Sequence, residues 1–206
     1  FTMVVDEVQN YPDAQSQYVF LNYYISSKFN HLFRSVSTEI LSSALAPTSD
    51  ASFVQRLRDI QVSLFSSFID IDVEKLSVLQ RRQLELPIKH CGFGLGDLLP
   101  TARAAYIASF ITTFDFVNKY FSSEEILGSS FGVCFRNNIT ILNQFRDDEQ
   151  KIDEEELLAH SKEYFYLQKS INDVNKQLAV DRFMGDVARM EVSSEEISKY
   201  KALMLS

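Results

Sequence analysis

The chain of 206 residues is long enough to bury a core, as one large domain or as two small ones. It has only 6 Gly and 4 Pro, too few for the turns of a many-stranded β protein, and its 17 Phe and 9 Tyr exclude long disorder. The net charge of −8 argues against an autonomous nucleic-acid binder, because such proteins neutralise phosphates with Lys and Arg.

Apolar residues recur every three or four positions over residues 14–35, which predicts an amphipathic helix. Residues 37–41 predict a shorter helix, ended by Ala46-Pro47. We expect Asp50 to cap a third helix and Asp72 to cap a fourth, because a carboxylate accepts hydrogen bonds from the free N–H groups of a first turn.

A glycine-rich loop separates these helices from an Ala-rich one. Residues 86–97 hold three of the six glycines and cannot continue a helix. Pro100 suits the first turn of the next helix, where its missing N–H costs nothing. The small residues that begin the stretch 102–120 allow close approach of neighbours, so this helix is predicted to be central. The residues expected to shape the loop are Pro87, Gly92, Gly94 and Gly96.

The pattern of the remaining chain also predicts helices. Residues 122–125 (SSEE) form a capping signature for a helix that is expected to break near Gly128 and then resume. Acidic residues 147–156 are predicted to be a solvated linker that leads into a long helix over 153–184. A last helix is expected to begin at Ser193. The predicted fold is therefore an all-α multi-helix bundle, with the glycine-rich loop before a central Ala-rich helix.

The charge is distributed unevenly along the chain. Residues 1–120 hold 10 Lys and Arg against 12 Asp and Glu, whereas residues 121–206 hold 10 against 16. We therefore expect a helical domain over residues 1–120 and an acidic helical extension over 121–206, packed on it.

The sequence also bears on the compartment. No apolar run approaches the ~20 residues that cross a bilayer, and residues 1–7 lack the features of a signal peptide. Cys91 and Cys134 lie far apart, so two free thiols are predicted in preference to one disulfide. Because Phe1 is not a natural initiator, the numbering is expected to begin inside a longer chain or after processing. These features predict an intracellular protein, cytoplasmic or nuclear, without membrane association.

No grouping of residues predicts catalysis, a metal or a cofactor. The three loop glycines lack the spacing of a dinucleotide fingerprint, and the histidines and cysteines lack the spacing of metal ligands. The tripeptide Asn138-Ile139-Thr140 matches a glycosylation sequon, which often arises by chance. Two acidic pairs are interpreted as helix caps rather than metal ligands: Asp70/Asp72 and Asp147/Asp148. We therefore predict a protein that is not an enzyme on its own.

Five basic side chains flank the glycine loop. One interpretation is a solvated face with salt bridges. The other is a patch that contacts an anion or a nucleic-acid backbone, because Arg forks suit phosphate oxygens. The residues are Arg81, Arg82, Lys89, His90 and Arg103.

Residues 21–34 (LNYYISSKFNHLFR) and 84–110 (LELPIKHCGFGLGDLLPTARAAYIASF) form two stretches that resemble the reverse-transcriptase-like open reading frames of non-LTR retrotransposons. Leu21–Arg34 (LNYYISSKFNHLFR) resembles a family helix that ends in a Lys-Leu-x-Tyr-Leu-Leu-Arg-like string. After a helical spacer, residues 84–110 resemble Gln-Leu-x-Leu-Pro-x-x-x-Gly-Gly-Leu-Gly-Leu followed by Ala-x-Ala-Ala-Tyr-Leu-Ala-Ser. Cys91 departs from this pattern and occupies the usual first glycine. The matching positions are Leu86, Pro87, Gly92, Gly94, Leu95, Ala102, Ala104, Ala105, Tyr106, Ala108 and Ser109.

The resemblance covers roughly residues 15–115 and implies a region after the polymerase palm, the thumb and following helices, which helps to hold template and primer. The palm's aromatic-x-Asp-Asp string is absent, so no catalytic residue carries over. Two functions are expected. The first is a non-catalytic helical interaction or scaffold module, derived from a retroelement, that serves a protein partner or larger complex. The alternative is a thumb-like segment of a larger reverse transcriptase that contacts nucleic acid.

Overall fold

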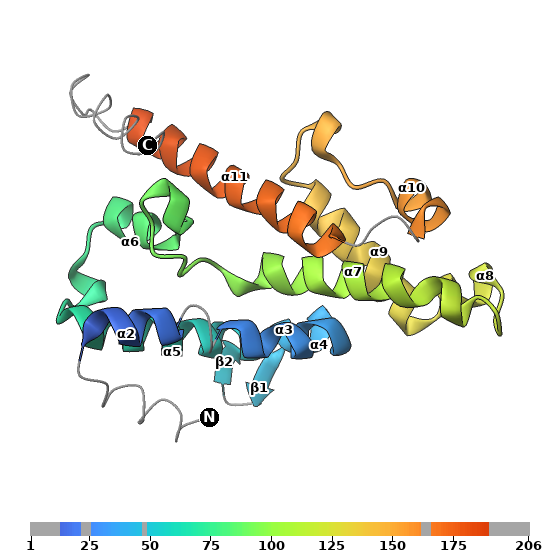
Figure 1. Ribbon diagram of the computed structural model, residues 1–206, viewed down its shortest axis with the longest axis horizontal. Coiled ribbons are helices and arrows are strands. Elements are labelled where there is room, and N and C mark those ends of the chain that lie inside the picture. The colour runs from blue at the N-terminus through green and yellow to red at the C-terminus, as the bar shows by residue number, and fades with distance from the viewer. Residues whose placement is uncertain (1–12, 22–25, 47–48, 162–165, 190–206) are drawn as a thin grey trace. The chain divides into compact units, whose positions relative to one another are not determined.

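The computed structural model describes residues 13–21, 26–46, 49–161 and 166–189 (Figure 1). These residues form helices, apart from turns and one antiparallel hairpin of two short strands, β1 (Ala44–Ala46) and β2 (Ser49–Ser52). The predicted all-α multi-helix class is confirmed. Among the described helices, none is both long enough and apolar enough to span a membrane.

The chain divides into two compact units, each built from separate segments. Unit 1 comprises the described residues of Phe1–Lys28, Arg56–Asp97 and Lys176–Ser206, and unit 2 comprises those of Phe29–Gln55 and Leu98–Asn175. This division differs from the predicted boundary at residue 120, because the folded chain groups residues by contact and not by local charge.

Unit 1 contains helices from both ends of the described chain. Three helices belong to it only in part: α3 (Ser26–Ser35) up to residue 28, α5 (Phe53–Ile69) from residue 56 and α11 (Leu167–Arg189) from residue 176. Its other elements are α2 (Ala14–Val19), η2 (Val73–Lys75), α6 (Val78–Glu85) and η3 (Ile88–His90). Its core includes Leu86 from the glycine-rich loop, packed against three α11 residues, Val180, Phe183 and Val187.

Unit 2 is organised around the predicted central helix, α7 (Leu98–Val117). This helix packs against α4, α9 and α10 (Figure 1). The rings of Phe110 and Phe135 stack at 4.3 Å between centroids, which joins α7 to α9. The other elements are α3 from residue 29, α4 (Thr38–Ser42), the strands β1 and β2, the first residues of α5, α8 (Ser123–Gly128), α9 (Ser130–Asn143), η4 (Asp148–Gln150), α10 (Glu154–Ala159) and the first residues of α11.

Several helices begin where the sequence predicts. Ser122 and Glu125 form a reciprocal capping box at the start of α8, and Ser129 caps α9 directly after the predicted break. Asp72 accepts a hydrogen bond from the backbone N–H of Glu74, as expected for a cap, although the helix it begins is only the short η2. Short-range hydrogen bonds of this kind depend on a few neighbouring residues, which is why the sequence reveals them.

Other boundaries differ from the prediction. Asp50 does not cap α5, because it lies in β2, and the hydroxyl of Ser52 accepts the hydrogen bond from the N–H of Gln55 instead. The long helix predicted over 153–184 is two helices, α10 and α11, because α10 ends at Ala159. The predicted helix start at Ser193 lies outside the described residues.

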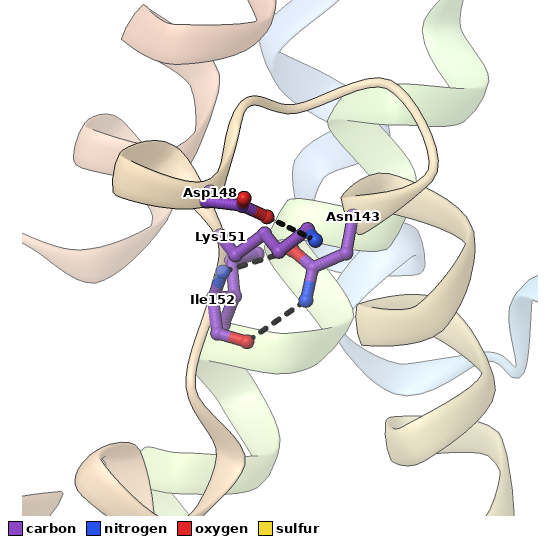
Figure 2. Close-up of polar contacts among 4 residues, drawn as sticks. All are labelled: Asn143, Asp148, Lys151 and Ile152. Atoms are coloured by element: carbon purple, nitrogen blue, oxygen red, sulfur yellow. Dashed lines mark hydrogen bonds and ion pairs between the residues drawn. The ribbon is translucent and has the colours of Figure 1, made fainter.

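The acidic linker is exposed, as predicted, but it is also held in place (Figure 2). The side-chain amide of Asn143 accepts a hydrogen bond from the N–H of Ile152 at 2.8 Å and donates one to the carbonyl of Ile152 at 2.9 Å. Lys151 pairs with Asp148 at 2.6 Å across one turn. The end of α9 therefore fixes where the linker turns towards α10.

Candidate functional site

The five predicted basic residues are divided between the two units. Arg81, Arg82, Lys89 and His90 belong to unit 1, whereas Arg103 lies on α7 in unit 2. Arg82 forms an ion pair with Asp186 of α11. For this residue, the ion pair agrees with the interpretation of the basic residues as a solvated face with salt bridges. Arg81 and Lys89 are exposed on unit 1.

The glycine-rich loop is a tight structural turn, as predicted, and not a phosphate cradle. Its N–H groups point inwards, because that of Gly94 donates to the carbonyl of Leu86 at 2.8 Å and that of Leu95 donates to the carbonyl of Leu84 at 3.0 Å. A Cβ added at Gly92 would meet the carbonyl oxygen of Leu86 at 2.1 Å. The backbone donors that would bind an anion are therefore used within the loop.

The acidic residues and histidines do not converge either. Within the described ranges, no three His, Cys, Asp or Glu side chains lie close enough together to hold a metal ion. The sequon residue Asn138 is buried, at 1% exposure, and its side chain accepts a hydrogen bond from the hydroxyl of Thr38 at 2.7 Å. The folded chain thus presents no glycan acceptor at this position.

A concave feature lies within unit 2. It is a half-open cavity of about 540 Å³. One side is a stripe of α7 residues spaced three and four apart, which is the spacing of one helix face. The residues of this stripe are Tyr106, Ser109, Phe110, Thr113, Phe114 and Val117. We call this feature the α7 cavity.

Two exposed aromatic rings from outside α7 also line the α7 cavity. Phe121, after the end of α7, is 58% exposed, and Phe131, at the start of α9, is 64% exposed. Ile126 and Ser129 also line the cavity, as does Ser35 at the end of α3. Two large rings therefore stand at the mouth of an apolar cavity while remaining largely in contact with water.

The hydroxyl groups in the wall do not make the cavity polar. The Thr113 hydroxyl donates to the carbonyl of Ser109 at 3.0 Å, and the Ser129 hydroxyl donates to the carbonyl of Ile126 at 2.6 Å. The Ser35 hydroxyl donates to the carbonyl of His31 at 3.0 Å. Because these protons are already bound to backbone oxygens, the wall selects for apolar groups.

Two charged side chains of opposite sign line the same cavity. The Glu125 carboxylate accepts hydrogen bonds at Oε2 from the N–H and hydroxyl of Ser122, both at 2.8 Å, which hold its pKa below the ordinary value of 4.5. Arg34 donates from Nε and Nη2 to the Gln168 side chain, at 3.1 and 2.7 Å. Among the described residues, no carboxylate pairs with Arg34.

A buried polar group lies behind the cavity wall. Cys134, at 1% exposure, is 3.4 Å from the Ser37 hydroxyl and 3.5 Å from the Asn138 amide. Burial, together with the neighbouring Cys134, raises the pKa of the Tyr106 hydroxyl far above its usual range. Tyr106 therefore stays neutral, and this group fixes how α4, α7 and α9 pack around the cavity.

Sequence reasoning missed the α7 cavity. The spacing of its apolar α7 residues was visible, but that spacing equally describes a core helix. What distinguishes the cavity is the position of α8 and the start of α9 beside α7, which no local pattern specifies. Comparisons of the chain with protein-family models, curated proteins and solved structures find no match.

Proposed function

We propose that this chain is a non-catalytic interaction module that binds a protein partner through the α7 cavity. The observation that carries this proposal is the combination of an apolar cavity of about 540 Å³ with two largely exposed Phe rings at its mouth. Exposed apolar surface beside a pocket is typical of interaction sites, since single exposed hydrophobics are common but clusters are not.

The hydrophobic effect favours a partner that covers the rings of Phe121 and Phe131. Phe121 and Phe131 together expose apolar surface whose burial contributes about 25 cal/mol for each Å² removed from water. Aromatic residues are enriched at protein interfaces because they bury a large area at a small cost in conformational entropy. An aromatic or aliphatic side chain from a partner is therefore the natural occupant of the cavity.

The proposal can be tested by blocking the cavity without disturbing the core. Thr113 lines the cavity and is exposed, whereas its neighbour Thr112 is exposed but does not line it. Both hydroxyls donate to a carbonyl four residues earlier, so the two sites are matched. Thr113→Arg is expected to place a charge in the cavity, and Thr112→Arg is the control.

The measurement is selection of a displayed library of random 14-residue peptides on the full chain. We expect enriched peptides that bind the parent chain and Thr112→Arg with equal affinity, and Thr113→Arg at least tenfold more weakly. Circular dichroism and thermal melts establish that both variants fold. If no enriched peptide distinguishes the two variants, the cavity is not an interaction site.

The alternative, a thumb-like segment of a larger reverse transcriptase, has one structural observation in its favour. Cys91, which stands where the family pattern has a glycine, adopts a left-handed backbone with φ 57°. Glycine is the residue that takes this conformation without strain, so the turn fits the family pattern. A retroelement origin, an intracellular location and a place in a larger complex belong to the same proposal.

This alternative makes a different claim about surface charge. It requires unit 1 to hold a nucleic-acid duplex through exposed basic side chains such as Arg81 and Lys89. Duplex retention at moderate salt in a mobility-shift assay, lost in Arg81→Ala/Lys89→Ala, would favour it over the interaction module. Arg82 is unsuitable for this test because its removal also breaks the ion pair with Asp186.

A further inference from the structure

We infer that the partner segment bound by the α7 cavity is an amphipathic helix of about three turns that runs antiparallel to α7. This inference rests on the proposed function and specifies the shape and polarity of the ligand. Three features of the cavity carry it: its length along α7, its volume and the two charged groups in its lining.

The length of the cavity matches a short helix. Its α7 stripe extends from Tyr106 to Val117, which corresponds to about three turns and roughly 16 Å along the helix axis. An apolar stripe of this length is matched by a ligand helix with apolar side chains at positions i, i+3 or i+4, and i+7. An extended peptide would cross the same distance with about five residues and present alternate side chains to solvent.

The volume of the cavity fits the apolar face of such a helix. An internal cavity of about 150 Å³ accommodates one benzene ring, so about 540 Å³ holds roughly three ring-sized groups. Three large side chains spaced three and four residues apart are what one face of a three-turn helix supplies. The mouth is half open, which leaves the polar face of the ligand helix in water.

The charged groups lie towards opposite ends of the α7 stripe. The Glu125 carboxylate is 2.8 Å from the N–H of Ser122, five residues beyond the last residue of α7. Arg34 is three residues before Ser37, whose hydroxyl is 3.4 Å from Cys134, and Cys134 in turn contacts the Tyr106 hydroxyl. Chain connectivity therefore places Glu125 near the Val117 end and Arg34 near the Tyr106 end.

These two charges complement the ends of a helix in one direction only. A helix carries partial positive charge at its N-terminus and partial negative charge at its C-terminus. The Glu125 Oε1 atom and the Arg34 Nη1 atom make no hydrogen bond with the described residues, so both remain available to a ligand. A ligand helix with its N-terminus at Glu125 and its C-terminus at Arg34 satisfies both charges, and this direction is antiparallel to α7.

The experiment uses a peptide selected on the full chain in the Thr113→Arg comparison, with both ends blocked. Two versions carry a single added Lys, one in the first turn and one in the last. Their affinities are measured by fluorescence anisotropy for the parent chain, Glu125→Gln and Glu124→Gln. Gln is accepted at the third position of a capping box, so Glu125→Gln removes charge and keeps the cap of α8. Glu124 is exposed, does not line the cavity and serves as the matched control.

The first-turn Lys peptide is expected to bind the parent chain and Glu124→Gln about two- to fivefold more tightly than Glu125→Gln. The last-turn Lys peptide is expected to show no such difference. The bound peptide should also gain helical circular dichroism. Two outcomes would overturn the inference but leave the interaction module standing. The first is that the selected peptides bind in an extended form. The second is that Glu125→Gln weakens the binding of both peptides equally, or weakens that of the last-turn peptide more. The absence of any cavity-dependent peptide would remove both.

Discussion

At the scale of single residues, the loop before α7 stores strain at one position. Among the described non-glycine residues, Asp70 and Cys91 have positive φ, at 51° and 57°. A left-handed backbone costs an L-residue about 1 kcal/mol or more because its Cβ approaches the carbonyl oxygen, although Asp tolerates it better than most. Cys91 is exposed and ends η3 in this conformation, so its Cβ adds backbone strain at this position.

Replacing Cys91 with glycine should therefore stabilise the protein. We expect Cys91→Gly to raise the free energy of unfolding by up to about 1 kcal/mol, the relief of backbone strain being partly offset by the greater freedom of glycine in the unfolded chain. The measurement is chemical denaturation followed by circular dichroism. Cys91→Ala removes the thiol but keeps the Cβ, so an equal gain in that variant would show that the thiol, and not the backbone, is responsible.

At the scale of elements, the junction of α8 and α9 depends on a close approach. A Cβ added at Gly132 would lie 2.5 Å from the Cα and the carbonyl oxygen of Leu127, atoms that cannot move aside cheaply. The neighbouring Gly128 has open space around the same position. Gly132 therefore sets the angle at which α9 leaves α8, and with it the position of Phe131 at the mouth of the α7 cavity.

The two glycines make a matched pair of variants. Gly132→Ala is expected to lower the free energy of unfolding by about 1–3 kcal/mol, because it forces backbone atoms apart, whereas Gly128→Ala should change it by less than about 0.5 kcal/mol. Thermal melts of both variants would measure this. Labelling of the buried Cys134 thiol should also become faster in Gly132→Ala alone. Equal stability of the two variants would contradict the close approach.

The elements also show what the sequence could reveal. Caps at Ser122 and Asp72 were predictable because the donor and acceptor lie within three residues of each other. That Ser52 and not Asp50 caps α5 was not predictable, because the hairpin formed by β1 and β2 extends to Ser52 and the sequence analysis did not anticipate it. The end of α10 at Ala159 was also not predicted, because the spacing of apolar residues continues past this position.

The candidate site was less accessible to sequence reasoning than the fold. The turn at Gly92 and Gly94 was identified from composition alone, and its structural role is what the hydrogen bonds show. The α7 cavity depends on residues as distant in sequence as Arg34 and Phe131, and nothing local marks them as neighbours. Burial could be predicted for the α7 face, but an incomplete covering of that face could not.

At the scale of the whole molecule, the two compact units are interleaved along the chain, so a division by charge at residue 120 does not coincide with them. Residues 1–120 contain α7 but not α9, whose Phe135 stacks on Phe110. Residue Asn175, which donates to the carbonyl of Pro100 at 3.5 Å, is also absent from that segment. A cut at residue 120 would therefore separate the central helix from the side chains that cover it.

The fragment 1–120 is expected not to fold into a monomer. Removing α9 exposes Ile107, Phe110 and Phe114, which are buried in the intact chain, and this should lead to aggregation or to loss of dispersed amide signals in NMR spectra. The intact chain, which keeps every segment of both units, is the control. A soluble fragment 1–120 with native-like dispersion would show that α7 finds sufficient cover without α9.

Because each unit combines segments that are far apart in the sequence, neither core can be completed until late in synthesis on the ribosome. Leu86, in the first half of the chain, acquires its cover from Phe183 and Val187, which are synthesised almost a hundred residues later. Unit 2 likewise requires Ile171 before its core closes around Ile107. The nascent chain must therefore keep its early apolar helices from aggregating until the residues of α11 have been made. Slow elongation would prolong this exposed state, and termination before Ile171 would release a polypeptide with neither core complete.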